Sequence, residues 1–335
     1  MSNRVEVIAE LAQGFEGRVE QARLLMKAAA AAGADAAKYQ LVYADELAAP
    51  DYKHYALFRT LEMPDAAWET LAADGAELGV PLHLDIFGAR SLALAERLGA
   101  AAVKLHPTDL ANAGMLAAVA ASAAPRVILG VGGAHGGEID TALGVLARKP
   151  VVLLLGYQGY PTPDDTNHIA RLRLVAARAA RIHANVQVGF ADHAAPDTPL
   201  RLALAAAAVG AGATVIEKHL TLGRNMALED HESALNPDEF LEFTRTLRAC
   251  AQAMGEASAA DDFGMSAPEA AYRSTIRRHV VAARPLSRGT VLAAADLVLK
   301  RTSATEPLTD LAAVYDRTLA RDLPANAPVL LADLS

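Results

Sequence analysis

The sequence predicts an α/β protein, a (β/α)8 TIM barrel followed by a small β-rich domain. Two observations predict the barrel: apolar runs of strand length alternate with helix-periodic stretches, and eight such runs occur over about 250 residues. A third observation predicts the second domain, because short strand-like pieces divided by turn residues follow residue 276. In a barrel of this kind the active site gathers at the C-terminal ends of the strands.

The predicted strands follow one another along the first three quarters of the chain. They are residues 5–10, 36–40, 81–86, 102–106, 126–131, 151–156, 186–192 and 214–220. Several of the helix-periodic stretches between them end in a glycine just before the next strand, which suits a helix C-cap and a short return loop. An open doubly wound sheet is the alternative, although no G-x-G-x-x-G turn follows the first strand.

The domain boundary is predicted where the helical pattern lapses, in EASAADDFGMSAPEAA, after the helix-like residues 237–255. We therefore expect a barrel domain over residues 1–262, a linker over 263–276 and a β-rich domain over 277–335. The last part contains HVVAARPL, TVLAAADLVLKR and APVLLADL, which alternate with turns rich in glycine and proline.

Composition favours a globular protein that acts on small molecules. The formal net charge is -8 and 53% of residues are hydrophobic, so a large core is possible and we expect no nucleic acid partner. No segment reaches the roughly 18 apolar residues of a membrane span. The single cysteine, Cys250, excludes an intrachain disulfide, and the start MSNRVEVIAE lacks the regions of a secretory signal. We expect a cytoplasmic protein that makes no membrane contact.

Two histidines occupy matching places on successive predicted strands. His193 ends VGFADH and His219 ends TVIEKH, at the catalytic ends of the seventh and eighth strands. Because these strands are neighbours in a barrel, the two imidazoles can share one divalent ion, such as Mn, and leave positions open for water and substrate oxygens. The alternative is that each is a core or loop histidine with its own hydrogen bonds.

Other strand ends are polar as well, at Glu10, Lys38, Gln40, Asp85, Lys104 and His106. Alternate residues of a strand share a face, so two residues of one strand are expected to point the same way in each of four pairs: Lys38 with Gln40, His83 with Asp85, Lys104 with His106, and Glu217 with His219. The barrel mouth would then mix cations and carboxylates, which suits an anionic oxo acid and a polar sugar or amide. The alternative for Glu10, Lys38 and Lys104 is a set of structural ion pairs that plug the barrel.

The order of motifs resembles that of the sialic acid synthase family, the N-acetylneuraminate synthases and their legionaminate, pseudaminate and spore-coat relatives. The motifs are VIAELA, AAKYQ, YPTP (160–163), GFADH (189–193), IEKHLTL (216–222) and EDHESALNPDEF (229–240). The tail RRHVVAARPLSRGTVLAAADLVLKR (277–301) is similar to the family's C-terminal antifreeze-like (SAF) domain. The resemblance extends along the whole chain.

The resemblance implies a metal-dependent condensation of phosphoenolpyruvate with the open-chain aldehyde of an N-acylated hexosamine. The products would be a nine-carbon 2-keto acid and phosphate. His193 and His219 would hold the metal that polarises the aldehyde, and Glu10 would act on a sugar hydroxyl or the attacking water. Asp230 would contact the sugar as a catalytic residue, and Tyr160 of YPTP would be among the substrate-binding residues.

The same resemblance implies how the donor is held. Lys38, Gln40 and Lys104 would bind phosphoenolpyruvate, and Lys38 would also be catalytic. Asp85 is a further substrate-binding candidate because of its place at a polar strand end. Arg301, in the KR pair of the tail, would reach the active site of the partner in a domain-swapped homodimer.

Several motifs depart from the family pattern. The family's CNHNG-like loop is here AQGFEG (12–17), STPFD is LDIFG (84–88), and the Cys-Asn-Thr after the sixth strand is GYQ (156–158). Serines of PSGE, STG and GFSDH are replaced by Pro107, Gly130 and Ala191, and TSATE follows Arg301 in place of a PGNG-type turn. The missing serines and asparagine are the groups expected around the phosphate, and a buried dianion without hydrogen-bond donors is costly.

These departures leave two further functions open. The first is a metal-dependent aldolase or lyase that keeps the metal and the lysines but uses pyruvate or another 2-oxo acid. The second is a non-catalytic relative that binds a sugar acid or regulates a true synthase.

Overall fold

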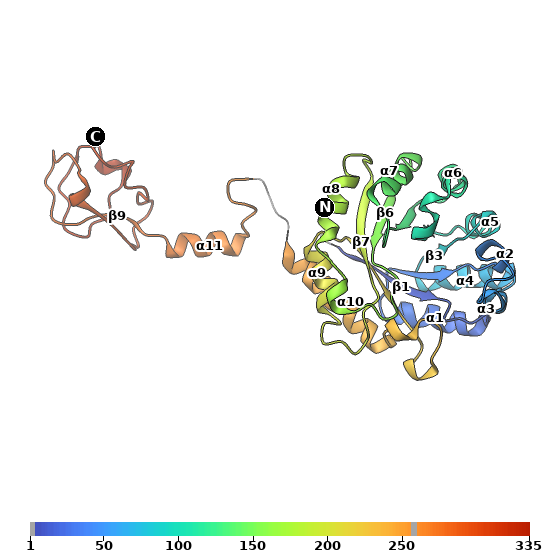
Figure 1. Cartoon of the computed structure of the whole chain (residues 1–335). Helices are drawn as coiled ribbons and strands as arrows, with labels where there is room; N and C mark the ends of the chain where they lie inside the picture. Colours follow the sequence, from blue (N-terminus) through green and yellow to red (C-terminus); the bar gives the residue numbers. More distant parts are fainter. Residues whose placement is uncertain (1–3, 256–259) are drawn as a thin grey trace. The chain divides into compact units, whose positions relative to one another are not determined.

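The computed structural model describes residues 4–255 and 260–335 of the chain (Figure 1). The chain divides into two compact units, one that ends at Gly255 and one formed by the residues after it. The barrel strands and helices α1 to α10 belong to the first unit, and α11, β9 and β10 belong to the second.

Within the described residues, eight parallel strands close into a barrel in which each strand pairs with its neighbours in chain order. β8 returns to pair with β1, so that Glu10 lies opposite His219. The strands are β1 (Glu6–Ala12), β2 (Ala36–Gln40), β3 (Leu82–Asp85), β4 (Ala102–Leu105), β5 (Val127–Gly130), β6 (Val151–Leu155), β7 (Val186–Asp192) and β8 (Val215–His219). The barrel prediction is confirmed, and the open doubly wound sheet is excluded by the closure.

The inside of the barrel has an apolar level below a charged one. The apolar level is a buried cluster formed by Ile8, Ala36, Ala102, Ile128, Val152, Leu154, Ala191 and Val215. Alternate residues of a strand face the same side, so the inward residue that follows Ile8 is Glu10 and the one that follows Ala36 is Lys38. Because of this alternation, the charged side chains lie next to the apolar level, on the side of the C-terminal ends of the strands.

Helices surround the barrel on the outside (Figure 1). They are α1 (Val19–Ala31), α2 (Ala44–Leu47), α3 (Tyr55–Leu61), α4 (Asp65–Leu78), α5 (Ala89–Arg97), α6 (Ala113–Ala121), α7 (Gly136–Val145), α8 (Arg171–Ala179), α9 (Ala203–Gly210) and α10 (Pro237–Met254). α4 ends at Gly79, whose φ of 70° lies in the left-handed region that glycine adopts without a steric penalty. In the part of the chain that the structure describes, no helix combines the length and apolar character needed to cross a membrane.

One aromatic cluster fastens the helical layer to the barrel. Phe15, Tyr39 of β2 and Trp68 of α4 are buried, and their rings meet edge to face with centroids 5.6 to 6.1 Å apart. The Tyr39 hydroxyl donates a hydrogen bond to the Ala22 carbonyl of α1, 2.8 Å away. The outward face of β2 is thereby tied to two helices, while its inward face carries Lys38.

The second unit has a core of its own. α11 (Ala267–Ile276) precedes a two-stranded antiparallel sheet of β9 (His279–Ala282) and β10 (Leu297–Lys300). Val280, Leu292 and Val329 belong to a buried cluster confined to this unit. The predicted linker, residues 263–276, contains α11, whose N-cap Ser266 accepts a hydrogen bond from the Glu269 amide. The proposed limits at residues 262 and 277 stay predictions.

Candidate active site

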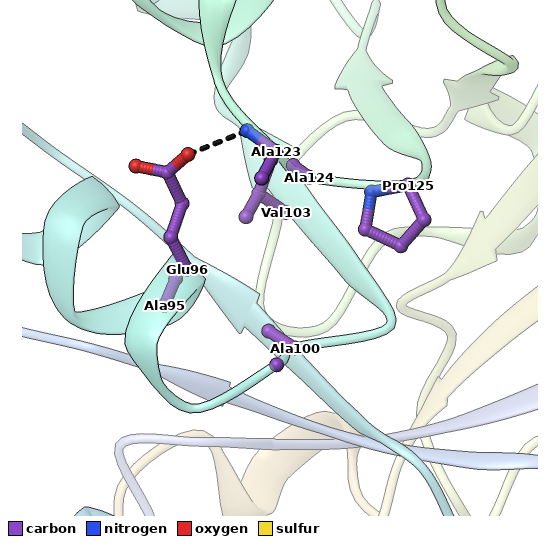
Figure 2. A pocket seen from close by; sticks show the side chains of 8 residues that line it. Ala95, Glu96, Ala100, Val103, Ala123, Ala124 and Pro125 are labelled. Atoms are coloured by element: carbon purple, nitrogen blue, oxygen red, sulfur yellow. Dashed lines mark hydrogen bonds between the residues drawn. The ribbon is translucent and has the colours of Figure 1, made fainter.

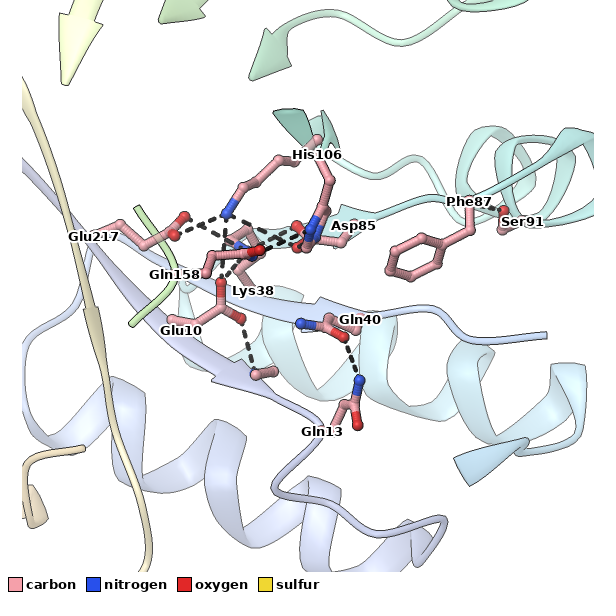
Figure 3. A network of polar contacts seen from close by, with 12 residues as sticks. Glu10, Gln13, Lys38, Gln40, Asp85, Phe87, Ser91, His106, Gln158 and Glu217 are labelled. Atoms are coloured by element: carbon pink, nitrogen blue, oxygen red, sulfur yellow. Dashed lines mark hydrogen bonds and ion pairs between the residues drawn. The ribbon is translucent and has the colours of Figure 1, made fainter. Parts of the chain in front are cut away.

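Five ionisable side chains form the charged level of the barrel, which we call the ion cluster: Glu10, Lys38, Asp85, Lys104 and Glu217. They come from β1, β2, β3, β4 and β8, and all are buried. The pairing register puts Glu10 opposite Lys38 and Asp85 opposite Lys104, and ion pairs connect the side chains across the barrel. Figure 3 shows the side chains of Glu10, Lys38, Asp85 and Glu217 pointing toward one another from their strands.

Lys38 is the centre of the ion cluster. Its Nζ contacts Glu10 Oε2, lies 2.7 Å from Asp85 Oδ1 and lies 3.5 Å from Glu217 Oε2. Lys104 Nζ lies 2.8 Å from Glu217 Oε1, and 3.9 Å from both Glu10 Oε2 and Asp85 Oδ2. Each lysine thus faces all three carboxyl groups, and neither ammonium group is free of a counter-charge.

The carboxylates of the ion cluster differ in their affinity for a proton. Burial raises the pKa of Glu10 to about 8, and the nearby Glu217 and Asp85 add to this rise against the opposing effect of Lys38. Burial also disfavours the charged forms of Asp85 and Glu217, but Lys104 and Lys38 outweigh it and lower the pKa of both. At neutral pH the cluster therefore holds two cations, two carboxylates and a neutral Glu10, so its charges balance.

A histidine extends the ion cluster toward the rim of the barrel. His106 Nε2 lies 2.8 Å from Asp85 Oδ2, and Gln158 Nε2 lies 3.2 Å from His106 Nδ1 (Figure 3). The His106 side chain is 13% exposed, whereas that of Asp85 is 1% exposed. The contact connects a buried carboxylate to an imidazole that solvent and small molecules can reach.

The two histidines of the predicted metal site lie side by side. The ring centroids of His193 and His219 are 5.3 Å apart, and the Tyr160 ring is 5.2 Å from the first and 5.5 Å from the second. Burial lowers the pKa of His193 to about 3 and that of His219 well below its ordinary value, so both are neutral at physiological pH. Burial also raises the pKa of Tyr160, which keeps its hydroxyl protonated.

This histidine pair suits a divalent ion in its donor chemistry. A metal requires the neutral imidazole, and His193 Nδ1 is buried without a hydrogen-bond partner among the described residues. The same residues contain no group of three or more His, Cys, Asp or Glu side chains that could hold a metal ion. Two imidazoles alone would leave the remaining coordination positions to water and substrate.

A buried ion pair fixes the backbone position next to both histidines. Lys218 Nζ donates to Asp192 Oδ1 at 3.1 Å and to the Ala194 carbonyl at 2.8 Å, and the same carboxylate oxygen accepts the Ala194 amide. Asp192 precedes His193 and Lys218 precedes His219. The pair joins the ends of β7 and β8 and so limits how far the two imidazoles can separate.

The remaining predicted residues have separate surroundings. Gln40 accepts a hydrogen bond of 2.6 Å from Gln13 Nε2 at the edge of the ion cluster (Figure 3). Asp230 is partly buried, and burial raises its pKa to about 6. Asp230 also raises the pKa of Tyr160 by its charge, which places it in the same electrostatic environment. Arg301 belongs to the second unit, where its Nε donates to the Ile276 carbonyl at 3.3 Å.

The strand period predicts that Glu217, His83 and His106 share a face with other residues of the barrel mouth, but it assigns none of them a role, and Gln158 is not predicted at all. Glu217 stands two residues before His219, and its contact with Lys104 confirms that it faces the barrel interior. His83 stands two residues before Asp85; burial lowers its pKa to about 3, and its Nδ1 lacks a partner in the described chain. Gln158 follows β6 in a loop, where no periodic signal exists.

A pocket at the other end of the barrel has a different character. It has a volume of about 180 Å³ and is lined mainly by small apolar residues, among them Ala100, Val103, Ala124 and Pro125 (Figure 2). Ala100 precedes β4 and Pro125 precedes β5, so the pocket lies at the N-terminal ends of the strands. Residues at that end of a barrel serve stability, so we assign the site to the ion cluster and the histidine pair.

Sequence comparison places the chain among known proteins. The NeuB family profile matches residues 25–259, and the SAF domain profile matches residues 277–335. The chain belongs to the NeuB family. This NeuB protein is 27% identical over 314 residues to the N,N'-diacetyllegionaminic acid synthase of Campylobacter jejuni, which covers 88% of this chain and 90% of the relative. It is 28% identical over 323 residues to an uncharacterized protein of Methanocaldococcus jannaschii, covering 94% and 90%.

A solved structure supports the same fold for this NeuB protein. A spore coat polysaccharide biosynthesis protein E from Chromobacterium violaceum matches with a TM-score of 0.81 and 25% identity, covering 99% of this chain and 100% of that one. The resemblance to the sialic acid synthase family and the C-terminal SAF domain are confirmed. Other relatives of this NeuB protein include pseudaminic acid synthases of Campylobacter jejuni.

The raised pKa of Glu10 predicts a pH-dependent stability. Folded Glu10 keeps its proton up to a pH of about 8, whereas the unfolded side chain ionises near 4.5, so unfolding between these values releases a proton and rising pH favours it. From pH 6.5 to 8 the free energy of unfolding should fall by up to about 1.4 kcal/mol per pH unit more in wild type than in Glu10→Gln, because the histidines are common to both proteins and cancel in the difference. Urea titrations followed by fluorescence of the single tryptophan, Trp68, measure this difference. Parallel pH profiles of the two proteins would contradict it.

Proposed function

We propose that this NeuB protein joins a three-carbon acid donor to the aldehyde of an N-acyl hexosamine-type sugar, which gives a nonulosonic 2-keto acid. The observation that carries the proposal is the ion cluster beside a pair of neutral histidines, at the C-terminal end of a barrel in a chain of this family. The names of its relatives, legionaminic, pseudaminic and N-acetylneuraminate-9-phosphate synthases, support the same class of reaction. The first candidate donor is phosphoenolpyruvate.

His193 and His219 are the residues that would hold a divalent metal such as Mn²⁺. A metal bound there would withdraw electron density from the aldehyde oxygen while a carbon nucleophile attacks the aldehyde carbon. The Tyr160 ring borders both imidazoles, so it covers one side of the histidine pair and limits the access of water to it. Asp230, which shares its environment, is the proposed contact for sugar hydroxyls.

The ion cluster supplies the acid and the cations. Neutral Glu10 can give the proton of its carboxyl group to an oxygen that gains charge, and it remains within the field of Lys38 when ionised. Lys104 and Gln40 lie nearer the rim and are the proposed contacts of the donor's carboxylate. Because the lysines already face carboxylates, a donor anion must share them.

A second candidate donor is pyruvate or another unphosphorylated 2-oxo acid. The charges of the ion cluster balance without a ligand, and the side chains of Pro107, Gly130 and Ala191 offer no hydrogen-bond donor. A C–β atom at Gly130 would lie 2.8 Å from the Pro107 ring, so these two residues close off one side of the mouth without a polar group. A phosphate dianion would find few hydrogen-bond donors there to offset the loss of its hydration.

The second unit is proposed to complete the site in a homodimer. The SAF domain profile and the position of Arg301 beyond α11 support an exchange of tails between two copies of the chain. Arg301 of one copy would then bind substrate at the barrel of the other. We propose that the reaction takes place in the cytoplasm.

Metal binding by the histidine pair is testable without knowledge of the sugar. We expect His193→Ala and His219→Ala proteins to lose bound Mn²⁺, and chelation to abolish wild-type activity, because a single imidazole is a weak ligand. Mass spectrometry of the metal content after dialysis against Mn²⁺ measures this, with the exposed His54→Ala as control. Equal metal content in both histidine variants and wild type would sink the assignment.

The exchanged dimer predicts complementation. Protein truncated after residue 262 should lose activity, and mixtures of Arg301→Ala with His193→Ala subunits should regain part of it, because one barrel of each mixed dimer then receives an intact tail and keeps both histidines. Light scattering gives the oligomeric state, and activity of the mixed proteins gives the complementation. A fully active truncated monomer would rule out the exchange.

The donor is decided by titration calorimetry. We expect weak binding of phosphoenolpyruvate by wild type and binding about tenfold tighter by Ala191→Ser, since a hydroxyl hydrogen bond to a charged group is worth roughly 1.5–3 kcal/mol. Pyruvate binding should change little, and Ala191→Cys, a weaker donor, serves as the control. Strong wild-type binding of phosphoenolpyruvate that the serine leaves unaltered would return the protein to the phosphoenolpyruvate-dependent reaction.

A further inference from the structure

Asp85, His106 and Gln158 form a chain of side chains from the ion cluster to the rim (Figure 3). Asp85 is ionised, because the lysines lower its pKa, so it accepts a hydrogen bond and His106 Nε2 carries the proton of that contact. His106 Nδ1 is then an acceptor, and its neighbour is the Gln158 amide nitrogen at 3.2 Å. The basic nitrogen of the imidazole thus faces the rim, on the side away from Asp85.

The charges around His106 come from β3, β4 and β2. Asp85 is in direct contact, Lys104 Nζ lies 3.9 Å from the same Asp85 oxygen, and Lys38 binds the other oxygen of that carboxylate. Gln158 and the Phe87 ring, whose centroid is 5.3 Å from that of His106, are uncharged neighbours. The carboxylate stabilises a proton on the imidazole and fixes the ring, which is how an aspartate supports a histidine base.

The negative charge of Asp85 also disfavours the binding of a phosphate group beside His106. Asp85 holds a negative charge at the mouth, and the two lysines are balanced by Asp85 and Glu217. A phosphate monoester adds about 1.5 to 2 negative charges to the carboxylate of a donor, whereas pyruvate carries a single charge. The ion cluster is therefore better matched to a monoanionic 2-oxo acid than to phosphoenolpyruvate.

The two donors differ in what they require from the protein. The double bond between C2 and C3 is already present in phosphoenolpyruvate, so its C3 needs no base. Pyruvate becomes a nucleophile only when a proton leaves its methyl carbon, and a base beside the donor must accept that proton.

We propose that His106, held by Asp85, is the catalytic base that removes a C3 proton from an unphosphorylated 2-oxo acid such as pyruvate. The Nδ1 lone pair takes the proton, the C–H electron pair becomes the C2–C3 double bond, and the carbonyl oxygen takes the negative charge. The C2–C3 double-bond pair then forms the bond from C3 to the aldehyde carbon, while the C2 carbonyl re-forms from the charge on its oxygen. The C=O pair of the aldehyde moves to the aldehyde oxygen, which receives the proton from the imidazolium, and no phosphate is released. The inference rests on the proposed condensation and specifies its donor.

Deuterium exchange tests this base without the sugar. Full-length protein loaded with Mn²⁺ is incubated with pyruvate in D2O, and mass spectrometry follows the deuterium that enters the methyl group. We expect exchange above the buffer rate in wild type and in the exposed-residue control His54→Ala, and a loss of about a hundredfold or more in His106→Ala. Added imidazole should restore part of the exchange to His106→Ala, which a purely structural role would not allow.

Asp85 is a positioning residue in this scheme, and its readout is the pH profile of exchange. Asp85→Asn removes the charge that stabilises the imidazolium, so the acidic limb of the profile should move to lower pH. Because Asp85 is buried in the ion cluster, the fluorescence of Trp68 first establishes that this variant is folded. If Asp85→Asn is not folded, the variant His106→Gln at the rim provides an independent measurement. His106→Gln should lose exchange as His106→Ala does.

The outcomes separate this inference from the proposed function. No exchange in wild type, or full exchange in His106→Ala, overturns the inference. Release of phosphate from phosphoenolpyruvate with an N-acyl hexosamine, without pyruvate exchange, overturns it while the proposed condensation stands. Exchange that depends on His106, without product from any such sugar, supports the base and rejects the proposed acceptor.

Discussion

The contact of Lys38 with three carboxyl groups is the constraint on which the rest of the barrel depends. Transfer of these charges from water into the interior costs several kcal/mol per ion, and only close partners offset this cost. The partners come from β1, β3 and β8, so they meet only when β8 has returned to pair with β1. Removal of one partner from such a buried group typically costs about 3–5 kcal/mol, which makes the closed barrel and its register a condition of the site.

The apolar level of the barrel contributes to stability, and the ion cluster above it supplies the groups for chemistry. Below the cluster, Ile8, Ile128 and Val152 fill the barrel with fully buried aliphatic side chains. Water is therefore excluded from beneath Lys38, and the low dielectric there strengthens the attraction of each ion pair and the resistance of Glu10 to ionisation. The same surroundings that make the charges costly give Glu10 a proton that it can donate near neutral pH.

The sequence predicts the parts of this site that follow from the period of a strand. The alternation of side chains, with glycines before the strands, indicates the barrel and places Glu10, Lys38 and Lys104 at its mouth. It does not indicate which charges meet, since Lys104 and Glu217 are 113 residues apart and their contact depends on barrel closure. The contact between His106 and Gln158 arises in loops, where spacing carries no such information. α11 had a local signal, Ser266 before Ala-Pro-Glu, which is an N-cap pattern within the residues predicted as a linker.

The balance of charge decides what the mouth can bind. Two ammonium groups face two carboxylates and one neutral acid, so an incoming anion must displace or share an existing partner. Ionisation of Glu10 would make the cluster negative and weaken the binding of any anionic ligand. A donor with one charge disturbs this balance least, and it leaves Asp85 free to hold His106. The ionisation of Glu10 and the identity of the donor are thus properties of one buried network, because both are set by how many negative charges Lys38 and Lys104 can satisfy.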